Sequence, residues 1–210
     1  MTDYFNLGDY SRDVTLNSES QTWFDRAMVW LFAYNHEEAI ECFEKAIAAD
    51  SECAFAYWGV AYAVGPNYNK HWDVFTPKEK GPVLEKAHKF LQAGLALPSL
   101  SNLEKLLLEA LVQRYPQNPD IEDFQEYTDA FASAMQPVYR EYSDDLDVCF
   151  VYAEALMTTM PWDYWGPMNE AKAATIKVIE KLEEVMEIEP DHPLALHLYI
   201  HTLEASASAK

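Results

Sequence analysis

Apolar residues recur along most of the chain at steps of three and four, which is the spacing of one face of an α-helix. Between residues 37 and 49, for example, Ala39, Phe43 and Ala46 fall on one helical face, and residues 124–142 repeat the pattern. Glycine is rare, at 6 residues, and no segment shows the strict alternation of a half-buried strand. We therefore predict an all-α fold.

Local start signals divide this pattern into separate helices. Thr76-Pro77-Lys78-Glu79 has the spacing of a capping box with proline at the first helical position, and Ser101-Asn102-Leu103-Glu104 has the same cap pattern. Such signals predict about nine helices with short connections, apart from one inserted loop at about residues 65–77. We place the helices near 19–33, 36–49, 52–64, 78–96, 101–114, 120–142, 145–160, 168–188 and 191–206. Residues 1–18 are then an N-terminal extension, and 19–210 are expected to form a single helical-repeat domain.

One stretch of the chain carries a recognisable repeat pattern. Trp23, Ala27, Ala39, Phe43 and Ala46 have the spacing W-x3-A-x11-A-x3-F-x2-A. This pattern resembles a tetratricopeptide repeat, a helical hairpin in which small residues let two helices touch while aromatic residues fill the gap. The resemblance implies a right-handed, tetratricopeptide-like solenoid of antiparallel helical hairpins.

Other parts of the chain match the repeat less completely. Ser51 stands where the family usually has proline, while Ile188-Glu189-Pro190-Asp191 restores the boundary pattern near the end. Three strings also resemble a group of bacterial and fungal tetratricopeptide proteins. They are AYWG (56–59) through GPNYN (65–69), EALM (154–157) with PW (161–162) and Trp165, and HP (192–193) through His197, Ile200-His201 and EAS (204–206). This second resemblance supports the fold and implies no particular activity.

In that group the chain normally continues into further helices beyond the third string. The last predicted helix, 191–206, has apolar residues on a face that a solenoid normally covers with a polar cap. We therefore expect either a truncated chain or a subunit that pairs through this helix, which would make a homo-oligomer.

The charge balance narrows the class of partner. Lys plus Arg is 15 against 35 for Asp plus Glu, which gives a formal net charge of −20. Nucleic acids and anionic membranes attract clustered cations, so neither is an expected partner. At 50% hydrophobic residues the chain is folded rather than a disordered acidic tail. The three cysteines lie far apart and support neither a disulfide framework nor a zinc knuckle. The sequence has no apolar signal peptide and no apolar segment long enough to span a membrane, so we expect a cytoplasmic protein.

The tetratricopeptide resemblance places certain helix positions on a concave surface. The aromatic and apolar residues at these positions are the predicted anchors for a partner: Phe24, Met28, Leu31, Trp58 and Tyr62. Such a groove suits a protein or peptide segment that is apolar, aromatic or basic. Residues of the inserted loop are expected to close over one side of it: Asn67, Tyr68, Asn69, His71 and Trp72.

A histidine cluster near the C-terminal end suggests a second kind of site. Residues four apart on a helix share a face, so two imidazoles here can reach one divalent metal ion, with a carboxylate one turn later as an oxygen ligand or base. The candidate ligands are His192, His197, His201 and Glu204. The same residues can instead be polar groove residues, hydrogen-bonded to neighbours such as Glu154 or the Trp162 indole, and the sequence leaves both interpretations open.

The function expected from the sequence is binding rather than catalysis. The chain has no phosphate-binding glycine loop, nucleophile elbow, dinucleotide fingerprint or calcium loop. We predict a protein- or peptide-binding scaffold that needs no cofactor. The competing hypotheses are a metal-binding protein or metal-dependent biosynthetic enzyme that uses the histidine cluster, and a purely structural role in an assembly.

Overall fold

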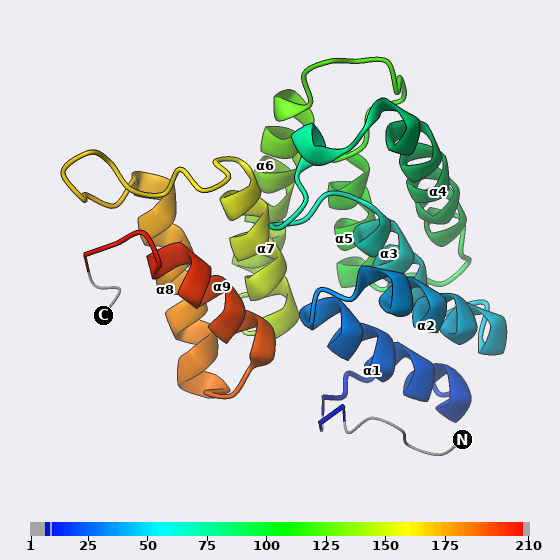
Figure 1. Cartoon of the computed structure of the whole chain (residues 1–210). Helices are drawn as coiled ribbons and strands as arrows, with labels where there is room; N and C mark the ends of the chain where they lie inside the picture. Colours follow the sequence, from blue (N-terminus) through cyan, green and yellow to red (C-terminus); the bar gives the residue numbers. More distant parts are fainter. Residues whose placement is uncertain (1–6, 9, 208–210) are drawn as a thin grey trace. The chain divides into compact units, whose positions relative to one another are not determined.

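Nine α-helices and one short 3₁₀-helix make up the secondary structure in the computed structural model, which describes residues 7–8 and 10–207, without the side chain of Pro193. The helices are α1 (Ser18–Phe32), α2 (His36–Ala49), α3 (Ala54–Val64), η1 (Trp72–Val74), α4 (Pro77–Leu95), α5 (Asn102–Val112), α6 (Gln125–Glu141), α7 (Leu146–Thr158), α8 (Ala173–Ile188) and α9 (Pro193–Leu203). Within this described part of the chain there is no strand, only two isolated bridges. The predicted all-α class and number of helices are confirmed (Figure 1).

Two compact units interleave along the chain. Unit 1 consists of Met1–Gly65 and Gly81–Leu111, and unit 2 of Pro66–Lys80 and Val112–Lys210. The inserted loop therefore belongs to unit 2 although it follows a helix of unit 1. The single repeat domain over 19–210 stays a prediction, and 208–210, like residues 1–6 and 9 of the expected N-terminal extension, lie outside the described residues.

The described part of the N-terminal extension packs onto unit 1. The Tyr10 ring meets the edge of Phe32 at 5.1 Å between centroids, and the backbone N–H of Arg12 donates to the Asp25 carboxylate at 3.2 Å. The Arg12 guanidinium lies 4.6 Å from the centroid of the Phe55 ring. These contacts tie the extension to α1 and α3.

Consecutive helices of unit 1 are neighbours, and the repeat-pattern residues lie where they meet. α1 packs on α2, α2 packs on α3, and α1 also contacts α3. Ala27, Ala39 and Ala46 are fully buried, which lets the backbones approach closely, and the Phe43 ring fills the space beside Phe24 at 5.7 Å between centroids. The spacing that suggested a helical hairpin thus corresponds to its buried contact.

Gly59 on α3 provides a test of this packing. A Cβ atom added to Gly59 would lie 2.5 Å from two atoms of the Phe43 ring, which is itself fully buried. We expect Gly59→Ala to lower the free energy of unfolding by about 1–3 kcal/mol, because the ring cannot move without disturbing the hairpin. Urea denaturation measures this change.

Gly81→Ala is the matched control for this prediction. A Cβ atom at Gly81, on α4, meets nothing within 4 Å. The better helix propensity of alanine is opposed by the crowding that proline imposes on the residue before it, here Pro82. We expect a change well under about 1 kcal/mol. Equal effects of the two substitutions would contradict the proposed close contact.

Of the two predicted capping boxes, the one at Ser101 forms completely, and at Thr76 only the half that is accepted by Glu79 forms. At the start of α4, the backbone N–H and the hydroxyl of Thr76 each donate to Glu79 Oε2 at 2.7 Å. The Lys70 ammonium donates to the other carboxylate oxygen, also at 2.7 Å, and these donors, Lys70 foremost, lower the pKa of Glu79 to about 2. At the start of α5, Ser101 N–H donates to Glu104 and Glu104 N–H donates back to the Ser101 hydroxyl.

Two predicted helix starts were placed too early. α6 begins at Gln125 rather than near 120, because the Asp123 carboxylate accepts the Gln125 N–H at 2.8 Å in a local turn that competes with the helix. α8 begins at Ala173 rather than near 168, because Asn169 has φ of 64° and so adopts a left-handed conformation that a helix excludes.

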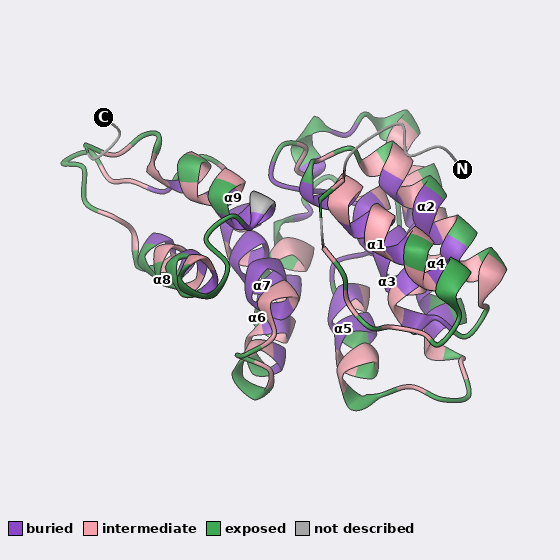
Figure 2. Ribbon diagram, turned by 90° about the horizontal axis from the view of Figure 1, so that it is seen from below, coloured by how far each residue is buried: buried purple, intermediate pink, exposed green. Residues whose placement is uncertain are grey.

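Unit 2 is built around α7. α6 packs on α7, α7 on α8 and α8 on α9, and α7 also contacts α9. α7 is buried on almost every side (Figure 2), with Phe150 and Met157 fully enclosed. Thr202 on α9 donates its hydroxyl to Leu198 and lies against the Met157 sulfur at 3.7 Å. None of the described helices has the length and hydrophobicity needed to cross a membrane.

Candidate functional site

The inserted loop begins with a tight turn held by Asn67. The side-chain oxygen of Asn67 accepts the backbone N–H groups of Asn69 at 2.9 Å and Lys70 at 3.0 Å. Asn67 is buried, whereas Asn69 is exposed. The turn directs the Tyr68 backbone N–H to the Glu154 carboxylate on α7, 3.1 Å away. Because Glu154 is only 3% exposed, this hydrogen bond is shielded from water.

The rest of the loop is also anchored in unit 2. The Trp72 ring is buried and stacks on Phe124 at 4.5 Å between centroids, with the edge of Tyr115 at 6.1 Å. The buried Arg114 guanidinium donates to the Pro66 carbonyl oxygen. The loop is therefore a packed part of unit 2, and its predicted closure over a partner stays a prediction.

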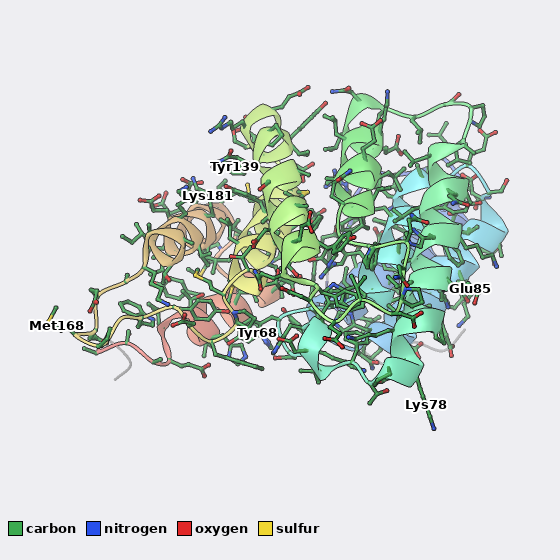
Figure 3. The ribbon with its side chains drawn as sticks, turned by 90° about the horizontal axis from the view of Figure 1, so that it is seen from above. Tyr68, Lys78, Glu85, Tyr139, Met168 and Lys181 are labelled. Atoms are coloured by element: carbon green, nitrogen blue, oxygen red, sulfur yellow. The ribbon has the colours of Figure 1, made fainter. Side chains whose placement is uncertain are left out.

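Tyr68, which is labelled in Figure 3, is the centre of an aromatic cluster in unit 2. Its ring centroid lies 4.6 Å from that of His201, 6.1 Å from Trp162 and 6.3 Å from Tyr164. His71 meets the edge of Trp162 at 4.9 Å. The Tyr68 side chain is 2% exposed, and its hydroxyl oxygen is buried without a hydrogen-bond partner.

Three side chains of the predicted metal site lie close together on α9. His197 and His201 lie on one face of the helix, and Glu204 follows its last residue. The ring centroids of His197 and His201 are 4.7 Å apart, and His201 Nδ1 lies 3.1 Å from Glu204 Oε1. Burial, and then the neighbouring His201, lower the pKa of His197, whereas the Glu154 charge raises it. The imidazole of His197 is therefore neutral at pH 7.

The negative charge of Glu204, at the end of α9, affects the pKa of Tyr68 in the inserted loop. Burial, and after it the negative charge of Glu204, raise the pKa of the Tyr68 phenol to about 12. The phenol therefore stays protonated at neutral pH and can donate a hydrogen bond. A charged side chain at the end of α9 and a phenol of the loop therefore interact electrostatically within unit 2.

His192 is apart from this cluster. It is the N-cap of α9, where its Nδ1 accepts the Ala195 N–H at 3.3 Å, and its ring lies 6.3 Å from that of Phe150. Burial lowers its pKa. The structure gives His192 a capping role, and it brings together only His197, His201 and Glu204 of the four candidate ligands.

The side chains near His197 and His201 do not form a metal site with three or more protein ligands in the part of the chain that the structure describes. Among the residues that the structure describes, no group of three or more His, Cys, Asp or Glu side chains is placed so as to hold one metal ion. Any metal bound by the cluster on α9 would have only two protein nitrogens and would take its other ligands from elsewhere.

The predicted groove anchors are interior residues. All five are at most 3% exposed: Phe24, Met28, Leu31, Trp58 and Tyr62. Trp58 and Tyr62 stack on each other at 4.8 Å between centroids. A partner could reach these rings only after the surrounding parts of the protein moved apart, so their role as anchors stays a prediction.

Residues 66–69 of the first string meet parts of the other two strings in unit 2. Tyr68 of the first contacts Glu154 of the second and His201 of the third. The Trp165 indole N–H donates to the Thr202 carbonyl oxygen at 2.8 Å, which joins the second string to the third again. Tyr68 and His201, which are 133 positions apart in the sequence, therefore contribute to one region.

Two residues of this region were not among the predicted site residues. Glu154 carried a signal, because it is the one carboxylate in the otherwise uncharged run 148–162, and a lone charge on a buried helix needs a partner. Tyr164 carried none, because a tyrosine between two tryptophans in a turn is not distinguishable from ordinary packing. The sequence matches no family model and no curated protein, so the tetratricopeptide resemblance stays a prediction.

Proposed function

We propose that this chain is a helical-repeat protein that binds an amphipathic helix of a partner along an exposed apolar face of α9. The observation that carries this proposal is the exposure of Leu196 and Ile200, one helical turn apart, at 38% and 64%. The opposite side of the same helix, including Ala195 and Leu198, is fully buried. α9 is therefore apolar on two faces, and only one of them is covered (Figure 2).

The helix arrangement within the units supports a repeat protein. In unit 1, α1 packs on α2 and α2 on α3, with a further contact between α1 and α3; in unit 2, α6 packs on α7, α7 on α8 and α8 on α9, with a further contact between α7 and α9. Neighbour and next-neighbour contacts of this kind are typical of stacked helical hairpins. In such a hairpin, another helix covers the outer face of each helix. A helix is therefore the kind of partner that fits the exposed face of α9.

Charge selects the chemistry of that partner helix. Residues 173–207 carry 2 lysines against 7 aspartates and glutamates, a net charge of −5 with the histidines neutral. An amphipathic helix with an apolar stripe and basic flanks is complementary to this surface. The proposed surface differs from the predicted aromatic groove because the groove anchors are buried, whereas Leu196 and Ile200 face solvent.

A synthetic helix tests this proposal. The probe is a lysine-rich peptide of about 18 residues with leucines at helical spacing, beside a scrambled peptide of the same composition. We expect the full-length protein to bind the amphipathic peptide at least about tenfold more tightly than the scrambled one, a difference of about 1.4 kcal/mol. Fluorescence anisotropy of the labelled peptides measures both affinities.

Substitutions localise the binding to α9. Leu196→Glu/Ile200→Glu is expected to lower the affinity at least about tenfold. The added carboxylates strengthen attraction to lysines, so a loss isolates the apolar contact. Val74→Glu, at a side chain that is 49% exposed on η1, adds a carboxylate elsewhere in unit 2 and is expected to leave binding unchanged. Circular dichroism checks that each variant is folded.

Three outcomes would overturn the proposal. Equal affinity for the two peptides would mean that charge alone attracts them, and unchanged affinity in the double variant would exclude the α9 face. Self-association of the protein, dissolved by the double variant in light scattering, would show that the occupant is a second copy of this chain.

A further inference from the structure

The cluster on α9 has a geometry that suits a small cation, independently of the partner helix. Two imidazoles bound to one ion, with metal–nitrogen bonds of about 2.0–2.1 Å, place their ring centroids about 5 Å apart. The His197 and His201 centroids are already 4.7 Å apart, with 57° between the ring planes. Their positions four apart on a regular helix hold this separation without a loop rearrangement.

Glu204 gives His201 the second contact that metal-binding histidines usually have. Its carboxylate Oε1 lies 3.1 Å from Nδ1 of His201, where a carboxylate accepts the ring N–H. This hydrogen bond leaves the lone pair on Nε2, the nitrogen that can bind a metal. The side chains of His201 and Glu204 are 28% and 49% exposed, so an ion can approach from solvent.

Tyr68 packs against the cluster. Its ring packs 4.6 Å from that of His201, and its buried hydroxyl has no hydrogen-bond partner. A buried hydroxyl without a partner costs free energy, so a polar group that reached it would be stabilising. This second observation distinguishes the cluster from a histidine pair on an ordinary exposed helix.

We propose that His197 and His201 chelate a late first-row divalent metal ion, with Glu204 as the residue that orients His201. Imidazole ligands suit Cu²⁺, Ni²⁺ and Zn²⁺, and two nitrogens leave the other coordination positions to water or to an external ligand. This open arrangement agrees with the lack of a third His, Cys, Asp or Glu ligand among the described residues. Cu²⁺ binds more tightly than Zn²⁺, and Mg²⁺ does not compete for a nitrogen site.

Calorimetric titration of the tag-free full chain with Cu²⁺ and Zn²⁺ tests the site. We expect one ion per chain, bound by the wild-type protein and weakened at least about tenfold by His197→Ala or by His201→Ala. His88→Ala removes an imidazole from α4 in unit 1 and is the matched control, with no expected change. Glu204→Gln is expected to weaken binding by about tenfold, because the amide orients the ring less firmly.

Spectroscopy distinguishes the proposed ligands from adventitious binding. The electron paramagnetic resonance spectrum of the Cu²⁺ complex is expected to show coupling to two imidazole nitrogens in the wild-type protein and to one in His197→Ala. Circular dichroism confirms that the variants are folded. Failure of the wild-type chain to bind one ion, or equal binding by the double variant His197→Ala/His201→Ala, would overturn the proposal and assign the affinity to the acidic surface.

Discussion

Replacement of Trp58 by alanine is expected to lower the free energy of unfolding by about 3–5 kcal/mol. The indole is 3% exposed and stacks on Tyr62 at 4.8 Å, so its removal leaves a cavity that the surrounding helices can fill only in part. The indole nitrogen has no hydrogen-bond partner, so the loss arises from apolar burial and packing rather than from a broken polar contact. Urea denaturation followed by circular dichroism measures the change.

The tryptophan at position 162 is the natural comparison. Trp162 is 54% exposed, and its ring meets those of Tyr68 and His71 edge to face, so Trp162→Ala is expected to cost about 1 kcal/mol or less. A cost below about 1 kcal/mol for Trp58→Ala as well would show that its ring faces an accessible surface. That result would restore the aromatic groove as the partner-binding surface.

Trp58 also shows why the predicted groove could not be read from spacing. The resemblance assigned helix positions to a concave face, but α3 is apolar all round, from Ala54 to Val64. A helix without a polar face has no sequence pattern that marks its solvent side, so spacing alone does not identify an open surface on it. The composition of the helix was a stronger signal than the numbering of its positions.

Local features were the most predictable part of the fold. The capping box at Ser101 is reciprocal, and at Thr76 the Glu79 carboxylate accepts both the backbone N–H and the hydroxyl of Thr76; both arrangements need only residues three apart. The adjacency of His197, His201 and Glu204 follows from helical periodicity for the same reason. Helix starts that depend on turn conformation, such as that of α8, were less predictable, because asparagine favours the left-handed conformation that Asn169 adopts but also occurs within helices.

The contacts that complete the candidate site join residues that are far apart in the sequence, so they could not be predicted from local patterns. Tyr68 meets Glu154 across 86 positions and His201 across a still longer separation. Both pairs depend on where the loop turns after Pro66, which the buried Arg114 guanidinium helps to set through the Pro66 carbonyl oxygen. No pattern in the sequence links Arg114 to that carbonyl, so the convergence of the loop, α7 and α9 had to come from the structure.

The hydrogen bond between the loop and α7 is expected to have the second large effect. Glu154→Ala removes the acceptor of the Tyr68 backbone N–H and leaves a buried donor unsatisfied. Hydrogen bonds to charged groups contribute about 1.5–3 kcal/mol, so we expect a loss of about 2–3 kcal/mol in the free energy of unfolding. Hydrogen exchange of the Tyr68 amide is expected to accelerate, because the loop can separate from α7 more readily.

Glu154→Gln separates the role of the acceptor from that of the charge. The amide oxygen can still accept the Tyr68 N–H in a side chain of the same shape, so this variant is expected to retain most of the stability and the slow exchange of that amide. If both variants lose stability equally, the negative charge beside His197 matters more than the hydrogen bond to the loop. If Glu154→Ala is as stable as the wild-type protein and the Tyr68 amide exchanges no faster, then the buried carboxylate does not hold the loop, because its desolvation cancels what its hydrogen bond contributes.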